Sequence, residues 1–167
     1  MTLSWDDYFS GLLAYVSLKS KDRHTKFGAV IVGPDKEIRS TGYNSFPRGL
    51  DDNVQARLER PEKYHWMEHA ERNAIYNAAR CGTQLKNCTL YINGHPCIDC
   101  ARAIVQAGIA EVVVCDSAES GFKERWSESI MRTEQLLREC GVAVRHIQMA
   151  DALSHQQETH SLPVERP

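Results

Sequence analysis

Two short segments of this chain carry metal-binding side chains in a fixed pattern. The first reads His69-Ala70-Glu71, and the second, which follows residues 72–95, reads Pro96-Cys97-Ile98-Asp99-Cys100. One imidazole and two thiolates can hold a zinc ion and leave its fourth coordination position open, which is the arrangement of a catalytic zinc site. The chain must therefore fold so that these two segments meet at one point.

Glu71 follows the histidine by two residues, next to the open position, and is not needed as a ligand. A carboxylate there can take a proton from water that a metal has activated and pass it on. Taken alone, Glu71 has a plainer interpretation as an acidic residue that favours a helix N-terminus. For the three ligands the alternative is a structural zinc site, but such sites normally use four protein ligands.

Composition limits the classes of protein to which this chain can belong. Its 167 residues suit one domain, which we place at residues 1–150, and the net charge of −2 gives no surplus of basic residues for bulk nucleic-acid binding. No apolar run predicts a membrane-spanning helix, and the N-terminus does not resemble a signal peptide, so we expect a cytoplasmic protein. The six cysteines are then expected to be free thiols or metal ligands rather than disulfides. We expect those outside the motif to be buried.

Hydrophobic periodicity and turn residues divide the chain into alternating elements. Ser4 and Asp7 resemble a capping box at the start of a helix over 4–19. Strands over 27–32 and 37–43 predict a hairpin, which an irregular loop over 44–64 follows. Further helices are expected over 67–80, 96–108 and 125–139, further strands over 88–93, 111–115 and 142–147, and a polar tail over 151–167.

The order of the later elements is strand, helix, strand, helix, strand. Helical crossovers predict that these three strands are parallel, whereas the early hairpin makes the sheet mixed. The expected fold is therefore of the α/β class, a three-layer α/β/α sandwich with a mixed five-stranded sheet. Both metal-bearing segments would lie in the first turns of helices, where partial positive charge lowers the pKa of a thiol.

The run from Ser20 to Val114 resembles the deoxycytidylate (dCMP) deaminase family of the cytidine deaminase-like superfamily. The motifs that carry the resemblance are Ser20-Lys21-Asp22, Gly28-Ala29-Val30-Ile31-Val32, Gly42-Tyr43-Asn44, His69-Ala70-Glu71-Arg72-Asn73-Ala74-Ile75, Pro96-Cys97-Ile98-Asp99-Cys100-Ala101 and Ile104-Val105-Gln106-Ala107-Gly108-Ile109. The spacing of the metal-binding residues is also similar to that of zinc-dependent base deaminases in general.

The resemblance implies a cytidine deaminase-like fold, and Zn²⁺ bound by His69, Cys97 and Cys100 with Glu71 as the proton shuttle. It implies a small-molecule nucleotide substrate, with ammonia released from C4 of dCMP to give dUMP. It further implies a homo-oligomer, often a hexamer, that responds to dCTP and dTTP.

The substrate contacts are less tightly defined by the sequence than the metal ligands. The resemblance implies a sugar contact for Asn44, whose alternative is to cap a turn. Lys21 and Arg48 can face a phosphate, or remain solvated surface charges. The candidate substrate-binding residues are Lys21, Asn44, Arg48 and Ala70. His65, four residues before His69, is expected to be a surface or packing residue, with a second metal ligand as the alternative.

This chain departs from the family pattern at three points. Residues 115–122 have no tyrosine where the family has one that helps to hold the phosphate, Ser45 stands where glycine is common, and His95 stands where an apolar residue is frequent. These differences leave open a modified, unphosphorylated or differently phosphorylated cytosine compound as the substrate. A tRNA adenosine deaminase shares the signature but suits the net charge less well. A zinc-stabilised binding module is the alternative that is not an enzyme.

Overall fold

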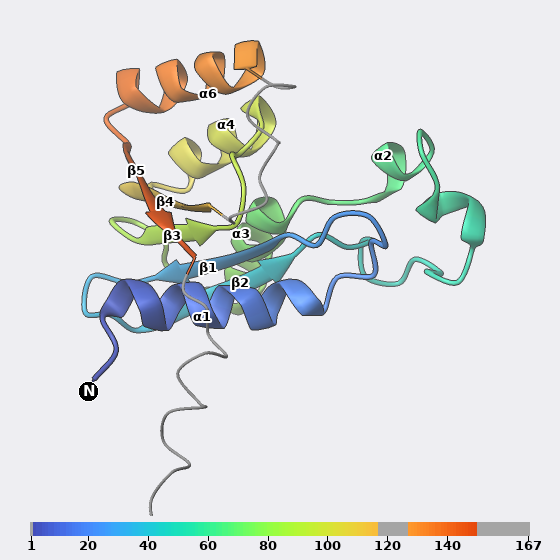
Figure 1. Cartoon of the computed structure of the whole chain (residues 1–167), viewed down its shortest axis with the longest axis horizontal. Coiled ribbons are helices and arrows are strands. Elements are labelled where there is room, and N and C mark those ends of the chain that lie inside the picture. The colour runs from blue at the N-terminus through green and yellow to red at the C-terminus, as the bar shows by residue number, and fades with distance from the viewer. Residues whose placement is uncertain (1, 117–126, 150–167) are drawn as a thin grey trace, which may run out of the picture.

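One mixed sheet forms the centre of the protein (Figure 1). The computed structural model describes residues 2–116 and 127–149, so residue 1, residues 117–126 and the predicted tail lie outside the described residues. The described strands are ordered β2-β1-β3-β4-β5. β1 (Gly28–Val32) pairs antiparallel with β2 (Ile38–Tyr43) and with β3 (Thr89–Ile92). β4 (Glu111–Asp116) and β5 (Ala143–Gln148) continue parallel to β3, so the predicted hairpin and parallel strands are confirmed.

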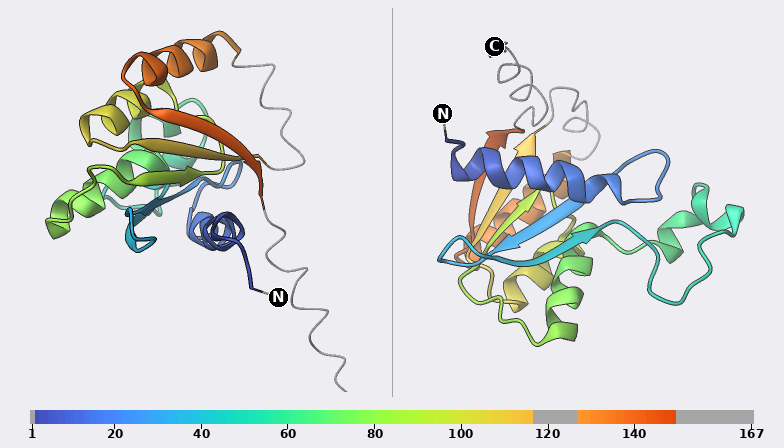
Figure 2. Two further views of the ribbon diagram at one scale, coloured as in Figure 1. Left: turned by 90° about the vertical axis from the view of Figure 1, so that its left-hand side faces the viewer. Right: turned by 90° about the horizontal axis from the view of Figure 1, so that it is seen from below.

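Helices cover both faces of the sheet (Figure 2). The described α-helices are α1 (Trp5–Leu18), α2 (Lys63–Trp66), α3 (Ala70–Cys81), α4 (Ile98–Gln106) and α6 (Ser127–Glu139). Val30 packs in one buried cluster with Phe9 of α1, whereas Ile31 lies in the opposite cluster with Ala74 of α3 and Leu137 of α6. This alternation confirms the three layers. No helix among the described residues is both long and apolar enough to cross a membrane.

Local sequence signals fix several helix ends. The Ser4 hydroxyl oxygen accepts a hydrogen bond of 3.1 Å from the Asp7 amide at the start of α1, as the capping box predicts. Gly82 ends α3 in the left-handed conformation, at φ +68°. The predicted start of α3 at residue 67 is wrong, because the Glu68 amide donates to the Ser45 carbonyl at 2.8 Å and keeps this segment extended.

Close packing fixes α3 against the edge strand β2. A Cβ atom on Gly42 would lie 2.4 Å from the Ala70 carbonyl oxygen and from the Ala74 nitrogen, a distance that real contacts do not reach. Ala70, Ala74 and Ala78 are all buried, and their small side chains allow this close approach. The first turn of α3, which carries Glu71, therefore has a fixed height above the sheet.

Asparagine side chains add hydrogen bonds between α3 and β2. The Asn73 amide donates to the Tyr43 carbonyl at 2.9 Å, and the Asn77 amide donates to the Thr41 carbonyl at 2.7 Å. These carbonyls belong to an edge strand, whose outer groups have no neighbouring strand to pair with. The two asparagines thus supply hydrogen-bond donors to the outer carbonyl groups of β2. They also fix the position of α3 along this strand.

The predicted irregular loop over 44–64 contains two short helices, η1 (Gln55–Leu58, a 3₁₀-helix) and the start of α2. In Figure 1 this segment extends sideways from the body of the protein. It is anchored by a buried ion pair, in which Lys63 Nζ lies 2.6 Å from Asp22 Oδ2 and the two side chains are 5% and 4% exposed. Neither helix has a repeating apolar pattern, which is why periodicity did not predict them.

Candidate active site

The side chains of His69, Cys97 and Cys100 meet at one point, at the starts of α3 and α4. His69 Nδ1 lies 3.5 Å from the sulfur of Cys97 and 3.5 Å from the sulfur of Cys100. A tetrahedral zinc ion with ordinary bond lengths places a nitrogen ligand and a sulfur ligand about 3.5 Å apart. The three side chains therefore fit a zinc ion, and no further His, Cys, Asp or Glu of the described residues joins their group.

Two of the three ligands are helix N-caps. His69 precedes α3 and Cys97 precedes α4, both with extended backbone, and neither side chain caps its own helix. The expectation that both lie inside the first turn is wrong by one position. The shift leaves the imidazole and the thiol free to turn toward the metal position, while Cys100 approaches it from the first turn of α4.

The thiols of Cys97 and Cys100 influence each other's ionisation in opposite directions. Hydrogen bonds with the Cys100 thiol and with the His69 ring hold the pKa of Cys97 far below its usual range. The pKa of Cys100 is raised, because its thiol donates to the Cys97 thiolate and because it is buried. The hydrogen bond with Cys97 also raises the pKa of His69. A divalent ion deprotonates the thiols that bind it, so both cysteines would bind zinc as thiolates.

Glu71 is a buried carboxyl group beside this cluster. Burial raises its pKa above the ordinary value, and the positive charge of His69 only partly opposes that rise. A carboxyl group whose pKa is raised by burial is a stronger proton acceptor than an exposed one, which suits a general base. Its position and its protonation behaviour both suit a group that carries protons between water and a bound molecule.

An ion pair that was not predicted from the sequence brackets the histidine. Arg72 pairs with Glu68 at 2.5 Å, and the same Glu68 oxygen accepts a hydrogen bond of 2.9 Å from the His69 amide. The pair therefore orients the backbone that carries His69. Its signal in the sequence was the spacing of four residues between an acidic and a basic side chain, although Glu68 itself precedes the helix.

Lys21 and Arg48, the two predicted phosphate contacts, line the same open cleft of about 280 Å³. Met67, two residues before His69, also lines this cleft. Lys21 pairs with Asp52, and Arg48 donates a hydrogen bond to Asn77. The fold thus brings together two cations that are far apart in the sequence, in a cleft that approaches the metal-binding segment.

The two other predicted substrate contacts are buried. The Asn44 carboxamide accepts a hydrogen bond of 2.8 Å from the Phe27 amide and donates one of 2.9 Å to the Thr25 carbonyl. Ala70 is the first residue of α3, and its side chain lies in the core. Asn44 therefore holds together the loop over 20–27, and the side chain of Ala70 is packed in the core rather than exposed to a ligand.

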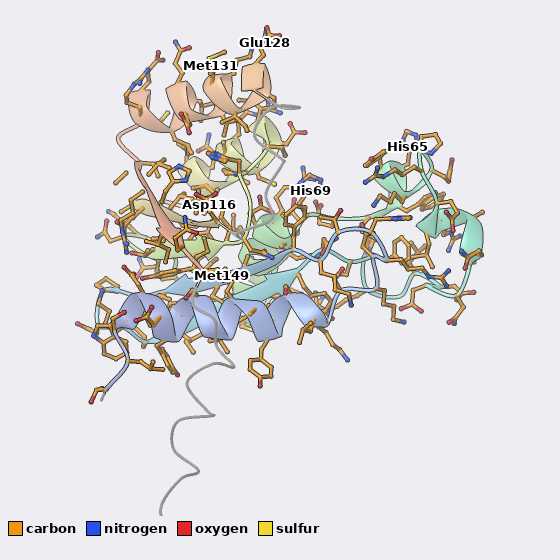
Figure 3. The ribbon with its side chains drawn as sticks, in the orientation of Figure 1. His65, His69, Asp116, Glu128, Met131 and Met149 are labelled. Carbon is orange, nitrogen blue, oxygen red and sulfur yellow. The ribbon has the colours of Figure 1, made fainter. Side chains whose placement is uncertain are left out.

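The remaining histidine and cysteine predictions have mixed outcomes. His65 lies on α2, apart from His69 (Figure 3), and is exposed. All six cysteines are free, as expected. Cys88 and Cys115 are buried, but the prediction of burial is wrong for Cys81 and Cys140, which are exposed at helix C-terminal ends.

Known proteins resemble this chain in sequence and in fold. Residues 3–116 match the family model described as the cytidine and deoxycytidylate deaminase zinc-binding region. Deoxycytidylate deaminase of Homo sapiens is 38% identical over 116 residues, which cover 66% of this chain and 64% of that protein. An uncharacterised deaminase from the luxG 3′ region of Aliivibrio fischeri is 35% identical over 144 residues, which cover 86% of this chain and 94% of that protein.

Among solved structures, the dCMP deaminase of cyanophage S-TIM5 in complex with dCMP and dUMP has a TM-score of 0.69 with this chain. It is 22% identical, and the match covers 88% of this chain and 99% of that one. This likeness confirms the expected cytidine deaminase-like fold. The chain spans about two thirds (64%) of the length of the human relative.

Proposed function

This chain belongs to the family of the cytidine and deoxycytidylate deaminase zinc-binding region, and we propose that it hydrolyses the 4-amino group of a cytosine nucleotide. The leading substrate is dCMP, which would give dUMP and ammonia. The observation that carries the proposal is the approach of His69 Nδ1 to two thiols, at 3.5 Å each, beside the buried carboxyl group of Glu71. Relatives named deoxycytidylate deaminase support the choice of substrate.

Bound by His69, Cys97 and Cys100, zinc supplies a Lewis acid that makes water more acidic. Glu71 then does the proton transfers. Its carboxylate accepts a proton from the water that attacks C4 and delivers that proton to the ring nitrogen N3. It next takes the hydroxyl proton and delivers it to the 4-amino group, which leaves as ammonia while C4 becomes a carbonyl. Burial raises the pKa of Glu71 and so strengthens it as the acceptor of the water proton.

Substrate recognition is assigned to the cleft beside Met67. Lys21 and Arg48 would bind the 5′-phosphate, since both line this cleft and both carry a charge that suits an anion. Ala70 would contribute its backbone N–H, one of the helix-start donors that has no partner within a helix. Asn44 would contact the sugar by exchanging one of its two internal hydrogen bonds.

A substrate panel with ammonia release as the measurement tests this proposal. We expect turnover of dCMP above that of CMP, dCTP, deoxycytidine and 5-substituted cytosine nucleotides. Absence of ammonia from all of these would overturn the proposal. Preference for another member of the panel would retain the reaction and change the substrate, and turnover of tRNA adenosine alone would move the protein to another branch of the superfamily.

Substitution of Glu71 separates catalysis from metal binding. Glu71→Gln keeps a side chain of the same size but cannot accept the proton of the attacking water. We expect zinc content to stay as in the unmodified protein and turnover to fall by about 10²–10⁴-fold, the usual contribution of a positioned acid or base. Retained turnover with retained zinc would remove Glu71 from the mechanism.

The proposal also covers the oligomeric state of the protein and its cellular compartment. Family resemblance favours a homo-oligomer that responds to dCTP and dTTP, which light scattering and assays with each nucleotide would test. We also propose a cytoplasmic location, which the six free cysteines support, because a reducing compartment keeps thiols unpaired. Fractionation of the source cells would test it.

A further inference from the structure

A second cluster of metal-binding side chains lies outside the site described above. His95 comes from the turn after β3, Glu134 from α6 and His146 from β5. Each offers a ligand atom, and these atoms all lie within 4.8 Å of one another. Among the described residues, this is the only group of three His, Cys, Asp or Glu side chains at such spacing besides His69, Cys97 and Cys100.

The distances in this cluster suit a shared ion better than direct hydrogen bonds. His95 Nδ1 lies 3.9 Å from Glu134 Oε1, which is longer than a hydrogen bond. Nitrogen and oxygen ligands of one tetrahedral zinc ion lie about 3.3 Å apart, given ordinary bond lengths. Small side-chain rotations would therefore bring these atoms to ligand spacing.

The burial of the three side chains differs in a way that would allow an ion to enter. The His95 side chain is 8% exposed, whereas those of Glu134 and His146 are 44% and 38% exposed. His95 is thus the fixed member, with its ring 5.0 Å from that of His146 between centroids. The two exposed side chains can move to meet an ion that arrives from solvent.

A carboxylate behind the cluster orients one of its ligands. His146 Nδ1 lies 3.1 Å from Asp116 Oδ2 at the end of β4. A metal-binding histidine commonly donates its other ring N–H to a carboxylate, which fixes the ring and places the lone pair on the nitrogen that binds the metal. Donation from His146 Nδ1 to Asp116 would leave the lone pair of this ring on Nε2.

We propose that His95, Glu134 and His146 form a second binding site for a divalent transition-metal ion, with zinc as the expected occupant. Imidazole and carboxylate donors suit this class of ion, and water would complete the coordination. The site would join α6 and β5 to the turn before Pro96, which leads directly to Cys97. Its role is to stabilise the C-terminal part of the fold and this turn.

Metal stoichiometry tests the proposal without reference to activity. Tag-free protein is stripped with a chelator, equilibrated with Zn²⁺ at micromolar free concentration, and analysed for zinc per chain by mass spectrometry. We expect two zinc ions per chain in the unmodified protein and one in Glu134→Gln and in His146→Asn. The matched control is Glu139→Gln, at the end of the same helix, which should keep two.

Cobalt distinguishes the two sites by their ligands. Co²⁺ bound by Cys97 and Cys100 gives an intense near-ultraviolet band from thiolate-to-metal charge transfer, whereas a site without sulfur does not. We expect one cobalt equivalent with this band and a second without it, and only the second should be lost in Glu134→Gln. One metal per chain in the unmodified protein, or two in both variants, would overturn the proposal.

Discussion

The segment that carries His69 is held from two sides by different kinds of interaction. On one side α3 packs closely on β2, where Gly42 meets Ala70 and Ala74. On the other side, residues 44–67 are held by the buried pair of Lys63 and Asp22. The first support is spread over close backbone packing, buried alanines and asparagine hydrogen bonds, whereas the second depends on one buried ion pair. The loop side should therefore be more sensitive to a single substitution and to pH.

Lys63→Met should have the largest effect on stability. It removes the positive partner of Asp22 and leaves a buried carboxylate, which also accepts a hydrogen bond from the His24 amide at 2.9 Å. Loss of one partner of a buried pair typically costs about 3–5 kcal/mol. Urea unfolding of the variant measures this cost.

The double variant Asp22→Asn with Lys63→Met is the control for this experiment. Replacement of both charges removes the buried, unpaired carboxylate, so we expect most of the lost stability to return. If both variants were equally unstable, simple packing of the lysine stem would explain the loss. The contrast between ionic and apolar support would then fail.

Gly42→Ala should have the next largest effect, on the α3 side. The added methyl group would collide with the backbone of α3 rather than with a flexible side chain, so the helix itself must move. Overpacking of this kind costs about 1–3 kcal/mol, and displacement of the first turn of α3 should also weaken zinc binding.

Gly33→Ala is the matched control for that substitution. The three atoms nearest to its new Cβ all belong to the carboxyl group of Glu37, the end of a flexible side chain that can turn away. We expect this variant to unfold close to the unmodified protein and to bind zinc normally. Equal losses of unfolding free energy in the two glycine variants would show that the close approach of α3 to β2 does not contribute specifically to stability.

Acid should weaken the loop side before the α3 side. Burial raises the pKa of Asp22, but hydrogen bonds from Lys63 and from the His24 and Thr25 amides outweigh this, so its pKa in the folded protein lies below 3.8. A group with a lowered folded-state pKa contributes its full stabilisation above the unfolded-state value and loses it as pH falls through the folded-state value.

Unfolding free energy measured between pH 7 and pH 3 tests this expectation. The unmodified protein should lose stability below about pH 4, whereas Asp22→Asn should have a smaller slope in that range. Hydrogen exchange should locate the earliest acid-induced opening in residues 44–67. Opening that begins in α3 would contradict the expectation.

Whether a feature depends on neighbouring or on distant residues also explains whether it could be predicted from the sequence. Capping at Ser4, the helical character of α3 and the extended character of β1 follow from local patterns that can be read along the chain. The metal-binding motif is similarly local, because its spacing within each segment is fixed. These features were predicted with errors of only a few residues.

Features that depend on distant partners could not be predicted in this way. Lys63 and Asp22 are 41 positions apart, and no local pattern links them. The ligands of the proposed second metal site come from a turn, a helix and a strand that only the fold brings together. The start of α3 was misplaced for the same reason, since Ser45 determines it from outside the helix.

Asn77→Ala should have the smallest effect, and it tests whether polar bonds also matter on the α3 side. The substitution leaves the Thr41 carbonyl, which accepts from Asn77 at 2.7 Å, without this partner. Because Thr41 lies on an edge strand, water can replace the amide, so the cost should be about 1 kcal/mol. A loss of this size in urea unfolding, with unchanged zinc content, would confirm that close packing rather than a single polar bond stabilises the α3 side. A loss as large as that of Lys63→Met would show instead that both supports depend on single polar bonds.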